Sequence, residues 1–167
     1  MSESSSIPDR ADDIAAVEAL LGRAPQGGFS VVVRSDDGSP VVICNDPFLE
    51  DGSPMPTRYW LVGAVECETV SRLEAGGGVK AAEAAVPEDE LADAHHRYSQ
   101  ERDALISPSH VGPRPFGGVG GTRRGVKCLH AHYAWHLAGG EDPVGKWVSQ
   151  QLMQVTATNP TANKDSQ

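Results

Sequence analysis

Residues 29–45 read FSVVVRSDDGSPVVICN, and this stretch decides the fold. Its two flanks, Phe29–Arg34 and Pro40–Asn45, are rich in β-branched residues, which favour strands. Between them, Ser35–Ser39 is made of Ser, Asp and Gly, which favour turns. We therefore expect a β-hairpin here.

Further elements are predicted outward from the hairpin. A loop dense in Asp, Gly, Ser and Pro follows it, and the bulky segment Arg58–Val62 then predicts a third strand. Hydrophobic periodicity predicts helices over Asp9–Leu21, from Ala64 to the glycines at 76–78, and over Pro87–Leu105, Val126–Ala138 and Pro143–Val155, with a short Ala-rich turn at Val79–Ala85. This order predicts an α+β fold in which a small three-stranded antiparallel sheet packs with about five helices.

Length and composition predict the domain organisation. A chain of 167 residues suits one domain with flexible ends. Residues 1–8 and 156–167 are rich in Ser, Thr, Asn and charge, and we expect both to be disordered tails. The single α+β domain is therefore expected at 9–155.

Charge and cysteine usage restrict the partners and the compartment. A net charge of -9 disfavours nucleic acid and anionic membranes as partners, because both require a cationic surface. No apolar run reaches the roughly 18 residues of a membrane span, and the polar N-terminus does not resemble a signal peptide. Three well-separated cysteines match no disulfide framework. We expect a cytoplasmic protein without membrane insertion.

A glycine-rich loop, Gly117–Gly125, is the first candidate site. Glycine frees backbone amides, and a following helix N-terminus with nearby Arg and Lys favours a bound anion. The loop is neither a Walker A motif nor a dinucleotide fingerprint, because no G-K-[ST] follows and no strand clearly precedes it. The alternative is a flexible connector. The candidate ligand-binding residues here are Gly120, Gly121, Arg123, Arg124, Gly125 and Lys127.

Cys128 is the second candidate, expected in the first turn of the helix that starts at Val126. A helix N-terminus and neighbouring cations such as Lys127 stabilise a thiolate. A nearby histidine could act as its base. The alternative is a buried, inert cysteine.

The histidines of the same predicted helix divide into two faces. At about 100° per residue, Cys128, His132 and His136 fall within an arc of roughly 80°, whereas His130 projects nearly opposite. A C-x3-H-x3-H face can bind a transition metal such as zinc, although a fourth ligand is not evident. The alternative, histidines with satisfied hydrogen bonds in the core or at the helix end, leaves no metal favoured.

The long predicted helix presents a further polar set on an apolar stripe. Its residues at spacings of four and three are Leu91, His95, Tyr98, Arg102 and Leu105. Arg102 could hold an anion in a cleft, with His95 and Tyr98 as proton donors; alternatively, all three form an interhelical hydrogen-bond network. We expect the cleft to lie against the helix bearing Lys127, Cys128 and His130. The candidate catalytic residues are Cys128, His130, His95 and Tyr98.

These residues carry a resemblance to a known family. The matching pieces are Asp51-Gly52-Ser53-Pro54-Met55-Pro56-Thr57, Tyr59-Trp60-Leu61, Ser71-Arg72-Leu73-Glu74, His95-x-x-Tyr98-x-x-x-Arg102, Gly125-Val126-Lys127-Cys128-Leu129-His130-Ala131-His132-Tyr133-Ala134 and Asp142-Pro143-Val144-Gly145. Over about residues 12 to 152 the chain resembles the domain-of-unknown-function family five hundred and one, found chiefly in actinobacteria. The resemblance implies a cytoplasmic bacterial protein, often encoded near a septum-formation initiator and an exopolyphosphatase-type phosphatase, and it implies no activity.

The resemblance also bears on the choice among functions. Many relatives have cysteines where this chain has Ser35 and Gly63, so a multi-cysteine zinc site would lose two ligands here. The Lys127-Cys128-x-His130 core of the resemblance favours His130 as the companion of Cys128, whereas the helical wheel points His130 away. The leading hypothesis is binding of a small anionic or phosphorylated ligand, with thiolate or histidine chemistry. The alternatives are a transition-metal module and a non-enzymatic interaction protein linked to the cell envelope or division, and protein partners are not identified.

Overall fold

The three strands of the sheet follow the hairpin prediction. The computed structural model describes residues 9–158 and contains β1 (Gly27–Arg34), β2 (Pro40–Leu49) and β3 (Tyr59–Leu61). The strands pair antiparallel in the order β1-β2-β3, with Val31 opposite Ile43 and Ile43 opposite Trp60. The predicted sheet is confirmed, although β2 continues beyond the predicted end at Asn45.

Helices make up most of the remaining described chain. They are α1 (Arg10–Leu21), α2 (Ala64–Ala75), α3 (Gly78–Ala85), α4 (Glu88–Asp103), α5 (Leu129–Leu137) and α6 (Pro143–Thr158), with a 3-10 turn, η1 (Val119–Gly121). The α+β class is therefore confirmed. The Ala-rich segment expected as a short turn is instead the helix α3, which is eight residues long. Gly22 ends α1 in the left-handed conformation, with φ of 73°, as its position after the predicted helix requires.

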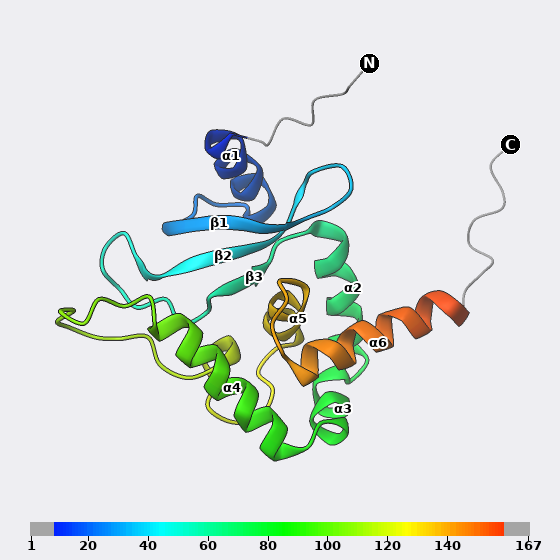
Figure 1. Ribbon diagram of the computed structural model, residues 1–167. Helices are drawn as coiled ribbons and strands as arrows, with labels where there is room; N and C mark the ends of the chain where they lie inside the picture. The colour runs from blue at the N-terminus through cyan, green and yellow to red at the C-terminus, as the bar shows by residue number, and fades with distance from the viewer. Residues whose placement is uncertain (1–8, 159–167) are drawn as a thin grey trace, which may run out of the picture.

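The sheet separates two apolar clusters because side chains alternate between its faces. On one face, α1 contributes Val17 to a small cluster with Ile43 and Val62. On the other face, Val42 and Leu61, the residues directly before Ile43 and Val62 in the sequence, join the larger core with residues of α2 to α6. Figure 1 shows this division, with α1 on one side of the sheet and the other helices on the opposite side.

The ends of the described chain modify the tail predictions. Thr156–Thr158, expected in the C-terminal tail, continue α6. The predicted tail at 1–8 and the remainder of the C-terminal one lie outside the described residues. Within residues 9–158, no helix combines the length and apolar character needed to cross a bilayer.

Candidate functional site

The start of α5 differs from the prediction and reorients Cys128. The helix begins at Leu129, and Cys128 is its N-cap, with an extended backbone at φ −154° and ψ 142°. The Cys128 sulfur accepts a hydrogen bond from the Ala131 backbone N–H at 3.4 Å. The expected start at Val126 is wrong because the residues before Leu129 are not helical: Gly125 is left-handed, with φ of 65°, and the Val126 N–H donates to the Glu83 carboxylate instead.

Cys128 lies in a cluster with two other side chains, Glu74 and His130. The three offer a sulfur, a carboxylate oxygen and a ring nitrogen, all within 4.8 Å of one another. Among the described residues, this is the one group of three or more such side chains close enough to share a metal ion. Glu74 comes from the last turn of α2, and its Oε1 accepts the Leu129 N–H at 2.6 Å. The cluster therefore joins α2 to the first turn of α5.

The cluster corrects the helical-wheel argument about His130. The wheel assumed that Cys128 and His130 both lie on a regular helix. Two residues at about 100° each rotate the side chain by about 200°, which leaves the two side chains roughly 160° apart around the helix axis. Because Cys128 is extended rather than helical, that rotation does not apply to it. The resemblance favoured His130 as the companion of Cys128, and the structure brings the two together.

Both ring nitrogens of His130 have partners. Nδ1 lies 3.2 Å from Oε1 of Glu74, and Nε2 lies 3.2 Å from the Cys67 carbonyl and 3.1 Å from the Ser71 hydroxyl. A backbone carbonyl only accepts, so the contact with Cys67 assigns a proton to Nε2. Nδ1 is consequently the nitrogen that faces the other members of the cluster.

The surroundings raise the pKa of His130 from 6.5 to about 9. The largest cause is its hydrogen bond with the Cys128 side chain, and the charge of Glu74 adds to it, whereas burial acts in the opposite direction. His130 is therefore a doubly protonated imidazolium at neutral pH. It donates from Nδ1 toward Glu74 and from Nε2 toward the Cys67 carbonyl.

His132 and His136 do not join Cys128, so the alternative metal set of Cys128, His132 and His136 is not assembled. His132 is fully buried, and its Nδ1 lies 2.6 Å from Oδ2 of the equally buried Asp142. His136 lies further along α5 and lines a separate cleft with Lys146. The physical reason is again the extended Cys128, which removes its sulfur from the helical face that the two histidines share.

His95 supports the glycine loop. Its Nδ1 accepts the Val119 N–H at 3.0 Å, and its Nε2 lies 2.9 Å from the Gly125 carbonyl, to which it donates. Burial is the main cause that lowers the pKa of His95. A neutral ring with one donor and one acceptor satisfies both contacts. His95 therefore holds two points of the loop against α4.

Tyr98 and Arg102 make comparable contacts with backbone. The Tyr98 hydroxyl accepts the N–H groups of Arg58 and Tyr59 at 2.6 Å and 3.1 Å, which fastens α4 to β3. The Arg102 guanidinium donates to the carbonyls of Pro56 and Gly117, both at 3.0 Å. Arg102 is 1% exposed. The polar face predicted on this helix is thus buried, and its contacts favour the hydrogen-bond network over a ligand cleft.

The glycine loop is folded rather than open. Gly120, Gly121 and Gly125 all have positive φ, the backbone region that glycine adopts most easily. A Cβ at Gly118 would lie 2.5 Å from His95, so only glycine permits this close approach. The N–H groups of Gly118, Val119, Gly121 and Val126 are already hydrogen-bonded within the protein. Within Gly117–Gly125, the N–H groups of Gly118, Val119 and Gly121 are therefore engaged and do not point to a bound anion.

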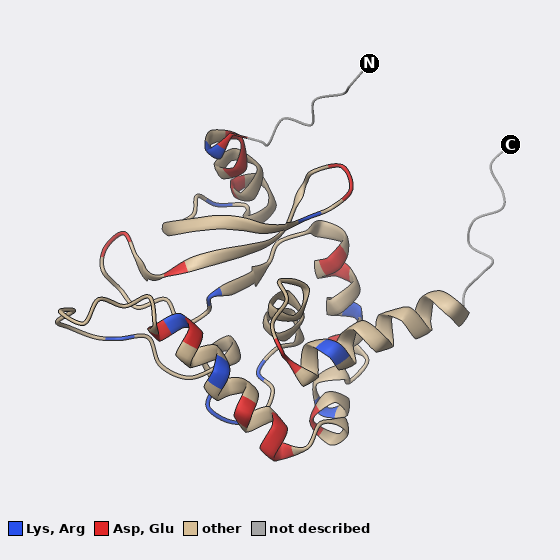
Figure 2. Cartoon of the chain, viewed as in Figure 1, with Lys and Arg blue, Asp and Glu red and all other residues tan. Residues whose placement is uncertain are grey.

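The basic side chains of the loop remain accessible. Arg123, Arg124 and Lys127 are exposed, and the Arg123 guanidinium lies 4.8 Å from the centre of the Phe116 ring. Figure 2 shows Lys and Arg along the loop that leads into α5. An open cleft of about 400 Å³ beside the loop is lined by His95, Arg102 and Arg123 among others, and Cys128 is not among its lining residues. The two sets of candidate residues thus face different surfaces.

Glu74 is the site residue that sequence reasoning missed. It lies 54 positions before Cys128, and no local spacing links the two. Its one signal was the Ser71-Arg72-Leu73-Glu74 piece of the family resemblance, which contributes two residues, Ser71 and Glu74, that contact His130.

Comparison with known proteins places this chain in one family. No curated protein and no solved structure was found to match it. A family model matches residues 31–150, a range that includes the hairpin from Val31 onward and all three members of the Glu74, Cys128 and His130 cluster. The chain belongs to the family described as "Protein of unknown function (DUF501)".

Proposed function

We propose that this protein binds a divalent transition metal, zinc being the best fit, through Cys128, His130 and Glu74. The observation that carries the proposal is the position of their three ligand atoms within 4.8 Å of one another. Thiolate, imidazole and carboxylate are all zinc ligands, and three protein ligands with an open fourth position are typical of zinc sites that bind or activate a further group.

The surroundings of the cluster resemble the outer hydrogen bonds of metal sites. A histidine that binds a metal through one nitrogen usually donates from the other to a carbonyl or carboxylate, which fixes its orientation. The Cys67 carbonyl has that role for His130, and the Leu129 N–H similarly orients Glu74. A metal would replace the proton on His130 Nδ1, so its uptake releases that proton.

The open fourth position gives the anionic ligand a place to bind. Because the N–H groups of Gly118, Val119 and Gly121 already have partners, we propose that an anion would depend on the metal and on exposed basic side chains. Lys127 directly precedes Cys128 in the chain, and Arg123 and Arg124 lie in the same loop. We therefore propose a small anionic or phosphorylated group as the additional ligand of the metal.

Zinc titration of the metal-free full chain, without a histidine tag, tests the proposal. We expect one zinc per chain by calorimetry and by elemental analysis. Cys128→Ser, His130→Gln and Glu74→Gln should each weaken binding at least about tenfold. Cys67→Ser and His136→Gln are matched controls because neither side chain belongs to the cluster, and both should retain wild-type affinity. Sub-stoichiometric zinc in the wild type, or equal losses in controls and cluster variants, would refute the site.

The closeness of His130 to Cys128 favours a second candidate function, a reactive thiol without metal. The Cys128 sulfur and a ring nitrogen of His130 lie within 4.8 Å of each other, and a histidine beside a cysteine is the pairing that activates nucleophilic cysteines. We expect metal-free protein to be alkylated at Cys128 by iodoacetamide several-fold faster than His130→Gln, with mass spectrometry locating the adduct. Equal rates in the two proteins would argue against this chemistry, whereas protection by zinc would support a shared site.

A further inference from the structure

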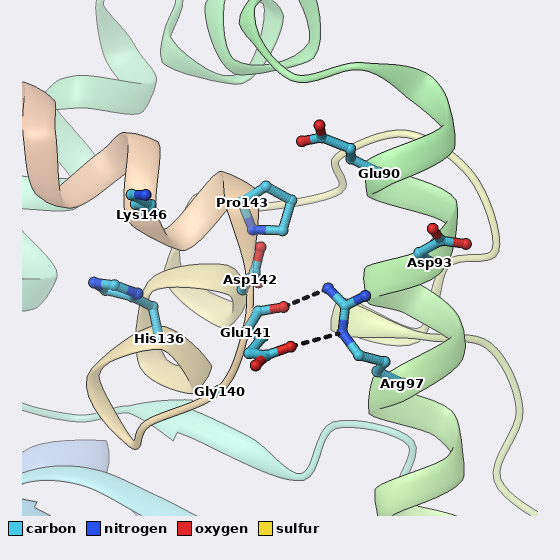
Figure 3. A pocket seen from close by; sticks show the side chains of 9 residues that line it. All are labelled: Glu90, Asp93, Arg97, His136, Gly140, Glu141, Asp142, Pro143 and Lys146. Carbon is cyan, nitrogen blue, oxygen red and sulfur yellow. Dashed lines mark hydrogen bonds and ion pairs between the residues drawn. The ribbon is translucent and has the colours of Figure 1, made fainter.

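A second cleft lies apart from the metal site proposed above, and none of Glu74, Cys128 and His130 lines it. It has a volume of about 440 Å³ and is lined by α4, by the α5–α6 connection and by the first turn of α6. Figure 3 shows Glu90, Asp93 and Arg97 along α4 on one wall, and His136 and Lys146 on the other. The volume lies in the range of small-molecule sites, about 300–1,000 Å³.

Some of the charges around this cleft are used within the protein. Arg97 donates to the Glu141 carbonyl at 2.7 Å and lies 4.0 Å from the Glu141 carboxylate. Asp142 accepts the Val144 N–H at 2.9 Å, and its other oxygen contacts His132. Arg97, Glu141 and Asp142 therefore already have partners within the protein.

The remaining charges lie on opposite walls and differ in sign. Glu90 and Asp93 are acidic and project from α4, whereas Lys146 of α6 is a cation, and the His136 ring of α5 lines the same wall as a hydrogen-bonding group. Within residues 9–158, none of the four makes an ion pair. The cleft therefore presents an uncompensated acidic wall and an uncompensated basic wall across one space.

Close packing fixes the basic wall. A Cβ at Gly145 would lie 2.4 Å from the His136 Cβ and 2.5 Å from the His132 carbonyl, so α6 approaches α5 as closely as glycine allows. A Cβ at Gly140 would lie 2.2 Å from the Trp135 ring nitrogen, which holds the connecting loop equally close. A rigid wall does not have to be ordered when a ligand binds, so less affinity is lost.

We infer that this cleft binds a small zwitterion, with its ammonium group toward Glu90 and Asp93 and its carboxylate or other acidic group toward His136 and Lys146. A purely anionic ligand would meet the acidic wall, and a purely cationic one would meet the basic wall, so each would incur repulsion. Amino acids whose two charged groups are separated by a carbon chain have the required chemistry.

Amide NMR of the full chain tests this inference with defined probes. We expect 4-aminobutyrate or 6-aminohexanoate to shift the amide resonances of Asp93, His136 and Lys146 in a saturable manner. Butylamine and butyrate, which carry one charge each, should bind about fivefold more weakly or worse. Asp93→Asn and Lys146→Gln should each weaken binding by a similar factor, whereas the matched controls Asp89→Asn and Lys80→Gln, outside the lining, should not.

Three results would overturn the inference: no saturable shift with either amino acid at tens of millimolar, butylamine binding as tightly as the amino acids, or butyrate doing so. The second and third would identify a cation site or an anion site instead. Repeating the titration with Cys128→Ser in the presence of a chelator separates this cleft from the metal site. We expect unchanged binding there, because Cys128, His130 and Glu74 do not line the cleft.

Discussion

His130 Nδ1 lies 3.2 Å from Glu74 Oε1, across a sequence separation of 56 residues. The same carboxylate oxygen accepts the Leu129 N–H at the start of α5. One side chain of α2 therefore both accepts a backbone N–H at the start of α5 and places a carboxylate beside His130. Both side chains are 26% exposed, so the cluster is accessible from solvent while partly shielded from it.

His130 makes the stability of the metal-free protein depend on pH. Its folded-state pKa is about 9, above the ordinary value of 6.5, so its stabilising contribution is complete below pH 6.5 and is lost as pH rises through 9. By linkage at about 1.4 kcal/mol per pKa unit, the contribution is about 3 kcal/mol. We expect the difference in unfolding free energy between wild type and His130→Gln to shrink over this window in urea titrations. Parallel pH curves for wild type and His130→Gln would contradict the prediction.

The same proton governs zinc affinity. Because the metal replaces the Nδ1 proton, and Cys128 binds it only after losing its thiol proton, we expect the zinc dissociation constant of the wild type to fall as pH rises toward 9, at up to about tenfold per pH unit for each proton released. Calorimetry in buffers of different ionisation enthalpy would count the protons released. A pH-independent affinity would remove His130 Nδ1 from the ligand set.

Arg102→Lys should destabilise the fold without affecting zinc binding. The Arg102 guanidinium donates hydrogen bonds to the carbonyls of Pro56 and Gly117 at once. The single ammonium group of a lysine does not have the same planar set of N–H donors and cannot reproduce both bonds. We expect a loss of about 2–3 kcal/mol in chemical denaturation, because buried hydrogen bonds to a charged group are lost. Arg72→Lys, at a side chain 78% exposed, should change stability by less than about 0.5 kcal/mol. Loss of zinc with retained stability would instead connect Arg102 to the site.

Gly118→Ala should loosen the glycine loop. The new Cβ would lie 2.5 Å from His95, so the ring must move and release the Val119 N–H that it accepts. We expect a cost of about 1–3 kcal/mol and faster hydrogen exchange at Val119. Gly76→Ala is the control, because its φ is −81° and the nearest atoms to a new Cβ lie at 3.6 Å. Equal stabilities of the two variants would show that the loop tolerates the displacement.

Asp142→Asn should destabilise the contact between α5 and α6. The asparagine can keep accepting the Val144 N–H, but its amide then donates to His132 Nδ1. The His132 proton must move to Nε2, a fully buried atom without a partner among the described residues. Leaving that donor unsatisfied should cost about 2 kcal/mol in thermal or urea unfolding. Asp36→Asn in the exposed hairpin turn is the control, and a variant as stable as that control would contradict the proposed network.

The sequence by itself determined the elements of the fold. The β-branched segments around Ser35–Ser39 predicted the hairpin, and the Arg58–Val62 segment predicted the third strand, because alternation and turn chemistry are local properties. Hydrophobic periodicity similarly located α1, α2, α4 and α6 to within a few residues. The buried face of α4 followed from spacing alone: His95, Tyr98 and Arg102 are buried together.

Only the tertiary structure decided which of the polar residues meet. Spacing on one helix joined Cys128 to His132 and His136, yet the extended backbone of Cys128 turns its sulfur toward His130. No periodicity could identify Glu74, because its approach to Cys128 depends on how α2 packs against α5. Secondary structure depends mainly on residues that are close in the sequence, whereas a site built from two helices forms only when packing of the core has fixed their relative positions.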